Sequence, residues 1–516
     1  MEKEQFATAV EKGYTFSGEK INIGRAMLGA ETVAGVDVYL PLKTMNRHGL
    51  IAGATGTGKT KTLQMISEAL SGASVPVLLL DIKGDLSGIA LPGTLNDKIA
   101  ERIQKLTIAY EPKGVPVELL TLSDKPGIRL RATVSEFGPV LLSKILSLND
   151  TQGGVVALIF KYCDDASMPL LDLKDFIKVL QYISNEGKKE LEQQYGKIST
   201  TSTGTILRKV IELQQQGADV FFGERSFEVD DLMRIGDDGR GMVSILRVTE
   251  LQDRPKLFST FMLQLLAELY ATLPEEGDLE KPKLVMFIDE AHLIFNDASS
   301  VLQQQVETIV KLIRSKGVGV FFCTQNPTDI PASILSQLGM KIQHALRAFT
   351  AADRKTIKQA AENYPESAFY DTDELLTQLG IGEALVTLLN EKGIPTPLVH
   401  TMMAPPRSRM DVLTDSEVAA IVQRSGIRMK YNEVLDSESA FEILTRKLAT
   451  AEQRGEEIKA LETAAKETKK TGAKEESWLD NPMVRSAGRT AATMITRSLL
   501  GVLGLGSNSR RRKGLF

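Results

Sequence analysis

The sequence GATGTGKT at residues 53–60 constrains the fold of this chain more than any other stretch. It fits the pattern in which a glycine, four residues of any kind and a second glycine precede a lysine and then a serine or threonine. A short apolar run at 49–52 comes before it, and residues 62–70 follow it with the apolar spacing of a helix. The sequence therefore predicts a strand, a phosphate-binding loop and a helix, which is the start of an α/β fold with a parallel sheet.

The residue types of this loop are those that bind nucleotide phosphates. Glycines let backbone N–H groups turn inward around phosphate oxygens, and the start of the helix adds its positive end. We expect Lys59 to reach the β- and γ-phosphates of ATP and the Thr60 hydroxyl to bind Mg²⁺. A glycine-rich turn with an incidental lysine is the alternative, and the flanking strand and helix argue against it. The predicted nucleotide-binding residues of the loop are Gly53, Ala54, Thr55, Gly56, Thr57, Gly58, Lys59, Thr60 and Lys61.

Composition limits the class of protein. The 516 residues are 42% hydrophobic and 25% charged, as in globular proteins with a large core. The formal net charge of −4 is unlike the strongly basic charge of small nucleic-acid binders. Residues 1–14 are charged and lack the apolar core of a signal peptide, and no apolar run has the length of a membrane span. We therefore expect a cytoplasmic protein.

Changes in apolar pattern along the chain predict its organisation. Buried strands alternate with helices around the loop and again after residue 241, whereas long amphipathic stretches separate the two parts. The predicted segments are a lead-in of short strands at 1–45, the first part of the nucleotide-binding core at 46–132, a helical insertion at 133–240, the second part of the core at 241–406, a charged helical extension at 407–475 and a basic tail at 476–516.

The sequence KLVMFIDEAH at 283–292 predicts the second half of the nucleotide site. An apolar strand ends in Asp289, which at the carboxyl edge of a parallel sheet can hold Mg²⁺ beside the phosphate loop. The adjacent Glu290 can polarise the water that attacks the γ-phosphate. An acidic cap on the following helix is the alternative for Glu290 considered alone.

Two further residues are candidates for the same reaction. Gln325 ends the apolar strand of GVGVFFCTQNP, the next strand after the one that ends in Asp289, where it could sense the γ-phosphate or orient the water. Arg314 precedes that strand on a segment expected to face a neighbouring subunit, so that it would neutralise charge in the neighbour's transition state. A surface arginine on a helix is the alternative for Arg314.

The order of these motifs resembles the HerA–FtsK superfamily of ring-forming P-loop ATPases, and longer blocks look like its bacterial HerA-like branch. The blocks that carry the resemblance are GATGTGKT, DIKGDLSG, FIDEAH, LIRSKGVGV and CTQNP, and the resemblance covers residues 20–405. It implies a RecA-like α/β core, a homohexamer and translocation of double-stranded DNA. It also implies that Arg314 acts in trans, that Gln325 is a sensor, and that Asp81 and Asp85 of the DIKGD motif line the same nucleotide site.

A basic amphipathic pattern marks the tail. Apolar residues recur from Val484 to Val502 with arginines between them, and RRRK follows at 510–513. Such a helix can lie on an anionic membrane, on nucleic acid or on a partner subunit, and packing on its own ring is the plainer alternative.

Three functions fit an ATP-hydrolysing core. We expect a DNA-dependent translocase with ATP and Mg²⁺ as cofactors. The rival is an assembly or signalling ATPase whose ring acts on a protein partner without pumping DNA. A small-molecule kinase is disfavoured, because a water-activating Glu290 is a liability where phosphate must pass to another acceptor.

Overall fold

The computed structural model describes residues 2–249, 255–277, 279–295, 300–433, 435 and 437–471. Contacts within the chain divide it into two units. The first, which we call the core unit, comprises Met1–Thr133 and Gln215–Leu435. The second, the helical unit, comprises Val134–Gln214 and Asp436–Phe516. The basic tail predicted at 476–516 lies outside the described residues.

The core unit is built on one sheet, for which the described residues supply 12 strands in the order β2-β1-β12-β11-β10-β3-β9-β8-β4-β7-β5-β6. The strands are β1 (Lys20–Leu28), β2 (Glu31–Pro41), β3 (Gly49–Ala52), β4 (Val77–Asp81), β5 (Val117–Thr121), β6 (Ile128–Arg129), β7 (Val243–Arg247), β8 (Leu284–Ile288), β9 (Val318–Thr324), β10 (Met340–Gln343), β11 (Glu383–Thr387) and β12 (Val399–Met403).

Most of this sheet is parallel. Every pairing from β10 across β3, β9, β8, β4, β7 and β5 to β6 is parallel, whereas β11, β12, β1 and β2 continue the sheet in antiparallel pairs. Strands β3, β4, β8 and β9 are buried at every residue, which explains their unbroken apolar sequences. The predicted α/β fold with a mainly parallel sheet is confirmed.

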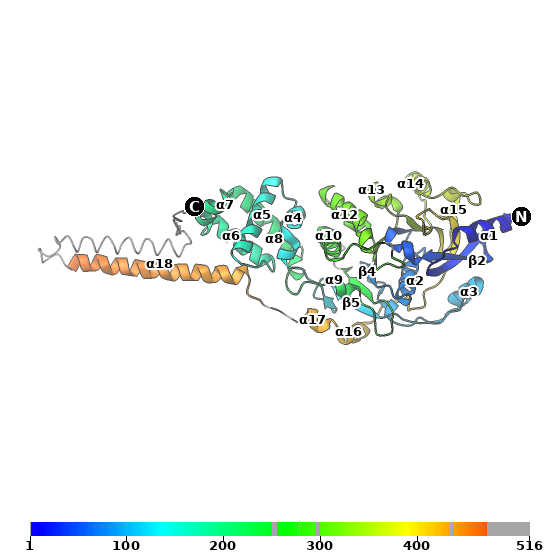
Figure 1. The fold of residues 1–516 in the computed structure, drawn as a ribbon, viewed down its shortest axis with the longest axis horizontal. Helices are drawn as coiled ribbons and strands as arrows, with labels where there is room; N and C mark the ends of the chain where they lie inside the picture. The colour runs from blue at the N-terminus through cyan, green and yellow to red at the C-terminus, as the bar shows by residue number, and fades with distance from the viewer. Residues whose placement is uncertain are drawn as a thin grey trace, which may run out of the picture. The chain divides into compact units, whose positions relative to one another are not determined.

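Helices lie on the core unit's sheet (Figure 1). Leu63 and Ile66 of α2 join one apolar cluster with Ile51 of β3 and Leu79 of β4, so α2 is fixed directly behind the loop from which it starts. The described α-helices of five or more residues in the core unit are α1 (Glu2–Gly13), α2 (Lys59–Gly72), α3 (Asp97–Leu106), α10 (Pro255–Thr272), α12 (Ser300–Ile313), α14 (Ala351–Ala361), α15 (Thr372–Gln378), α16 (Asp415–Arg424) and α17 (Arg428–Asn432).

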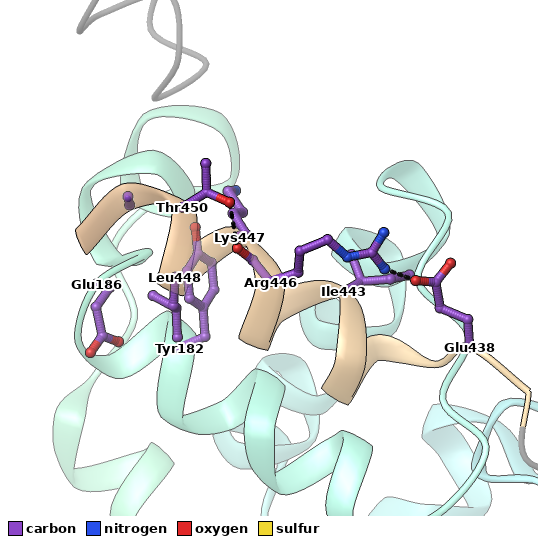
Figure 2. A pocket seen from close by; sticks show the side chains of 9 residues that line it. Tyr182, Glu186, Glu438, Ile443, Arg446, Lys447, Leu448 and Thr450 are labelled. Carbon is purple, nitrogen blue, oxygen red and sulfur yellow. Dashed lines mark hydrogen bonds and ion pairs between the residues drawn. The ribbon is translucent and has the colours of Figure 1, made fainter. Parts of the chain in front are cut away.

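The helical unit contains the insertion and the helix that follows the core. Its helices are α4 (Val134–Ile145), α5 (Asp150–Asp165), α6 (Leu173–Ser184), α7 (Lys188–Tyr195), α8 (Thr200–Gln215) and α18 (Ala440–Thr471). The buried carboxylate of Asp175 ties α18 to α6, because it accepts hydrogen bonds from the Ser439 hydroxyl and from the Phe441 N–H. A cavity of about 520 Å³ lies between these two helices, with Tyr182 and Arg446 among its lining residues (Figure 2).

The structure places two segments differently from the predicted boundaries. Residues 215–240, expected in the insertion, group with the core unit. The cause is local pairing, because Phe221 and Gly223 exchange backbone hydrogen bonds with Ala132. Residues 407–435 also join the core unit, where the Leu413 N–H donates to Ser87 Oγ. None of the helices in the described part of the chain has the length and apolarity of a membrane span.

Candidate nucleotide site

Four neighbouring parallel strands bring the predicted site residues to one edge of the sheet. The order β3-β9-β8-β4 places the ends of these strands side by side. The phosphate loop follows β3, Gln325 follows β9, Asp289 and Glu290 follow β8, and Asp81 ends β4. Ligands of open α/β sheets bind at this carboxyl edge. Residues from four separated parts of the sequence therefore face one region.

The phosphate loop has the backbone shape that its glycines allow. Gly53 and Gly58 have φ angles of +151° and +112°, and a Cβ atom on Gly53 would lie 2.5 Å from the Cβ atom of His344. Helix α2 begins at Lys59, directly after Gly58. Within the described residues, the N–H groups of Gly58, Lys59 and Thr60 donate to no backbone acceptor. These amides are positioned to bind an anion at the helix N-terminus.

The Lys59 side chain is held inside its own loop. Its ammonium donates to the Gly53 carbonyl oxygen at 2.6 Å, and the residue is 7% exposed. Burial lowers the pKa of Lys59, and the neighbouring positive charge of Lys83 lowers it further. An anion between the two ammonium groups would favour the charged form of Lys59 and so offset both effects on its pKa. This fits the phosphate-binding role expected for Lys59.

Asp289 has a carboxylate suited to a cation. The Asp289 N–H continues the ladder past β8 by donating to the Leu80 carbonyl at 3.3 Å, and the residue is 4% exposed. Burial raises its pKa to about 7, although the positive charge of Lys83 acts in the opposite direction. Its Oδ2 atom has no hydrogen-bond partner among the described residues. A buried, unpartnered carboxylate oxygen fits the water-mediated Mg²⁺ contact predicted for this residue.

Glu290 is held by three neighbouring side chains. Its backbone has a φ of +46°, a value that is uncommon for residues other than glycine. Lys83 forms an ion pair with Oε1 of Glu290, and Gln325 Nε2 donates to the same oxygen at 3.5 Å. Nδ1 of His292 lies 3.2 Å from Oε2. Burial, the largest single influence, would raise the pKa of Glu290, but the hydrogen bond and charge of Lys83, together with smaller contributions from His292 and Lys59, outweigh it and the pKa is lowered.

The end of β4 and the loop that follows it carry Asp81 and Asp85, the two acidic residues predicted to line the nucleotide site. Asp81 is fully buried, and its carboxylate accepts N–H bonds from Gly84 at 2.7 Å, Asp85 at 3.2 Å and Leu86 at 3.2 Å. Asp81 thus shapes the turn, and a contact with nucleotide would compete with these three bonds. Asp85 is partly exposed, with one carboxylate oxygen buried and unpartnered among the described residues.

Lys83 was not predicted from the sequence as a residue of this site. It lies in the turn shaped by Asp81, between the two acidic residues that were predicted to line the site. The available signal was the lysine inside the DIKGD motif, since a cation within an acidic motif needs a partner. Its partner Glu290 is more than two hundred positions away in the sequence, and only the adjacency of β4 and β8 brings the two together.

Arg314 lies away from these residues. It begins a short 3-10 turn, Arg314–Lys316, immediately before β9, and its side chain is exposed. The Asn46 side chain donates to the Arg314 carbonyl at 3.5 Å, and Asn46 precedes β3. Arg314 is therefore at the amino edge of the sheet, whereas the other candidates are at the carboxyl edge.

A cavity of about 550 Å³ adjoins the phosphate loop. Gly58 and Thr62 form one side of it, and Ile99 of α3 and Met402 of β12 contribute apolar surface. Arg102 also borders the cavity and donates to the Gly382 carbonyl at 2.9 Å. Among the described residues, no group of three or more His, Cys, Asp or Glu side chains could hold a metal ion.

Comparison with known proteins places the chain in a family. The family described as "Helicase HerA-like C-terminal" matches residues 27–512. The DNA double-strand break repair helicase HerA of Sulfolobus acidocaldarius is 23% identical over 389 residues, which is 74% of this chain and 69% of that protein. The protein of the same name from Saccharolobus solfataricus is 24% identical over 368 residues, covering 70% of this chain and 66% of the relative.

The structure is also similar in part to solved structures. The plasmid coupling protein TrwB in complex with a non-hydrolysable ATP analogue has a TM-score of 0.49 and 14% identity, covering 77% of this chain and 99% of that one. VirB4 of Thermoanaerobacter pseudethanolicus has a TM-score of 0.47 and 16% identity, covering 76% of this chain and 97% of the other.

Proposed function

The chain belongs to the family of HerA-like helicase C-terminal regions and is a P-loop ATPase, and from this premise we propose that it works as a ring-shaped motor that translocates double-stranded DNA. The observation that carries the proposal is the meeting of Lys59, Glu290 and Gln325 at the ends of β3, β8 and β9. Lys59 supplies charge for phosphate, Glu290 supplies a base, and Gln325 contacts that base.

The residues of the site have separate tasks in hydrolysis. The open amides at the start of α2 and the Lys59 ammonium bind the β- and γ-phosphates. Thr60 and Asp289 are the residues that would hold Mg²⁺, which when bound neutralises negative charge on the phosphate oxygens. Glu290 accepts a proton from the attacking water as the bond to the γ-phosphorus forms, and ADP leaves with the electrons of the broken bond.

The cavity beside the loop accommodates the nucleoside part of ATP in this proposal. Its location next to Gly58 and Thr62 is where a nucleotide held by the loop would extend. Apolar surface from Ile99 and Met402 can pack on a base, and the NH₂ group of Asn96, whose side-chain oxygen caps α3, can donate a hydrogen bond. Arg102 keeps the wall in place through its bond to Gly382, whose N–H in turn donates to the Thr57 carbonyl of the loop.

The ring and the DNA are inferred from different observations. The exposure of Arg314 at the amino edge of the sheet supports a ring in which a second copy of the chain supplies the arginine that completes the site. A closed ring, with six subunits as the resemblance implies, provides every site with such a neighbour. DNA is proposed because the relatives that match this chain are named as DNA double-strand break repair helicases.

The test is the ATPase rate of the purified ring with and without double-stranded DNA. We expect stimulation by duplex DNA and ATP-dependent displacement of a protein block placed on that duplex. Lys59→Ala is the matched control, because it removes the phosphate-binding charge from a buried side chain and leaves the surface of the protein unchanged. Hydrolysis that is unchanged by DNA at every salt concentration would contradict translocation and favour the protein-partner ATPase.

A further inference from the structure

Glu290, the proposed base, has one carboxylate oxygen that is already occupied. Oε1 accepts from the Lys83 ammonium and from the Gln325 amide, the latter at 3.5 Å. The other oxygen, Oε2, is buried and makes no hydrogen bond within the described residues. A general base needs a free oxygen directed at its water. In the arrangement seen here the Lys83 ammonium pairs with the carboxylate at Oε1, and Oε2, with His292 Nδ1 at 3.2 Å, is the oxygen left to receive a proton, so Glu290 is a weaker base than a carboxylate without the Lys83 ion pair.

The backbone at Lys83 is fixed, whereas its side chain can rotate. Asp81 anchors the turn through three backbone bonds, and Gly84 has a φ of +80° that the turn requires. The Lys83 side chain is 34% exposed, whereas that of Glu290 is 6% exposed. The ammonium can therefore change partner by rotation of the side chain alone, without movement of β4 or β8.

Both lysines of the site are bound to protein oxygens that phosphate oxygens can replace. Lys59 donates to the Gly53 carbonyl, and Lys83 donates to the Glu290 carboxylate. Their positive charges are close enough for Lys83 to disfavour the charged form of Lys59. A triphosphate offers oxygens to both ammonium groups, whereas a diphosphate ends one phosphate earlier and so leaves fewer acceptors near β4.

We propose that Lys83 exchanges the Glu290 carboxylate for the γ-phosphate of ATP, and that this exchange releases Glu290 to act on its water. Lys83 is then a positioning residue for the base and the residue that distinguishes ATP from ADP. The inference rests on the proposed function, since it assumes that the loop after β3 binds ATP. It assigns to the DIKGD turn the task of keeping Glu290 a weaker base until the third phosphate is present.

A cycle of binding measurements tests the exchange. In wild-type protein, ATP must break the Lys83–Glu290 pair before Lys83 can bind the γ-phosphate. Glu290→Gln removes the charged partner, so the slowly hydrolysed analogue ATPγS should bind about tenfold more tightly, while ADP affinity stays the same. Lys83→Met should bind ATPγS about tenfold more weakly than wild type. The double variant Lys83→Met/Glu290→Gln should bind ATPγS no more tightly than Lys83→Met alone.

The cycle separates the exchange from its nearest rival. Glu290 and the γ-phosphate are both negative, so Glu290→Gln could tighten ATPγS binding by relieving their repulsion alone. In that case the tightening would be equal with and without Lys83, and this result would overturn the proposal. Equal losses of ATPγS and ADP affinity in Lys83→Met would also overturn it, because a general disturbance of the site does not select the third phosphate.

Control variants distinguish failure of the Lys83 exchange from failure of the proposed function. Lys283→Met is the matched control, because Lys283 is also 34% exposed and ion-paired, with Glu276, but precedes β8 at the opposite end from Glu290. It should leave both affinities unchanged. If Lys83→Met folds poorly, Lys83→Arg is the variant to measure. It retains the positive charge and should keep at least half of the preference for ATPγS over ADP. Absence of nucleotide binding in the wild-type chain would reject the nucleotide site itself.

Discussion

Arg314 and Gln325 lie at opposite ends of strand β9. Arg314 precedes the seven residues of the strand and Gln325 follows them. At a rise of about 3.3 Å per residue, the strand separates the two side chains by roughly 20 Å. Gln325 contacts Glu290, so Arg314 cannot reach the same nucleotide from within its own subunit. We therefore propose that the arginine acts on the site of a neighbouring subunit.

Mixed rings provide the test of this geometry. Arg314→Ala chains should bind ATP, assemble and be nearly inactive, since arginine fingers contribute on the order of a thousandfold to turnover. Mixing them with Glu290→Gln chains should restore partial ATPase activity, because some interfaces combine the intact Glu290 of one with the intact Arg314 of the other. Sizing of each ring must precede the assay. Turnover near the wild-type rate in Arg314→Ala alone would exclude the finger role.

Lys59→Ala should abolish nucleotide binding without unfolding the chain. The Lys59 ammonium contacts only the carbonyl of its own loop among the described residues, so its loss leaves the sheet and α2 packed as before. Calorimetric titration with ATP and thermal unfolding of the same sample give the two readouts. Wild-type turnover in this variant would remove the phosphate loop from the mechanism.

Glu290→Gln should bind ATP and hydrolyse it roughly a hundredfold or more slowly, because the amide keeps the side chain's shape but cannot accept the proton. Single-turnover hydrolysis of prebound ATP measures this step separately from binding. A variant that fails to bind ATP, yet hydrolyses each bound ATP at the normal rate, would show that Glu290 has a binding role instead.

The sequence predicted those parts of the site that are local in the chain. A strand, a glycine loop and a helix follow one another directly around GATGTGKT, and Asp289 and Glu290 directly follow an apolar strand, so short patterns suffice for both. The structure confirms the parallel sheet on which these predictions rested. The roles assigned to the individual side chains stay predictions.

Other elements depend on partners that are distant in the sequence. Strand β10 alternates polar and apolar residues over only four positions, and it exists because it pairs with β3 and β11. Its buried Gln343 is tolerated because Tyr364 donates to it at 2.9 Å. The Lys83–Glu290 pair likewise requires the adjacency of β4 and β8, which no local pattern reveals.

Asp289 makes the stability of the nucleotide-free protein depend on pH. Its folded-state pKa is raised to about 7 by burial, above the value of about 4 expected when unfolded. The protonated form is therefore favoured by folding, so this contribution is fully present below about pH 4 and is lost as the pH rises towards 7. Asp289→Asn should stabilise the protein on the order of 1–3 kcal/mol at pH 8 and have little effect at pH 4. Denaturant unfolding at both pH values checks the difference, and an equal effect at both would contradict the assignment.

Asp175 should control the attachment of α18 within the helical unit. Its two carboxylate oxygens accept from the Ser439 hydroxyl and the N–H groups of Phe441, Leu171 and Asp172, and the residue is fully buried. Asp175→Ala leaves these donors without an acceptor, which should destabilise the helical unit by about 3 kcal/mol. Limited proteolysis should then cleave near residues 437–445 much faster than in wild type, while ATP affinity stays unchanged because the nucleotide site lies in the core unit.

Asp164→Ala, at an exposed position of α5, is the matched control and should leave cleavage at the wild-type rate. Equal protection of α18 in the Asp175 and Asp164 variants would show that apolar packing on α6, rather than the buried carboxylate, holds the helix in place.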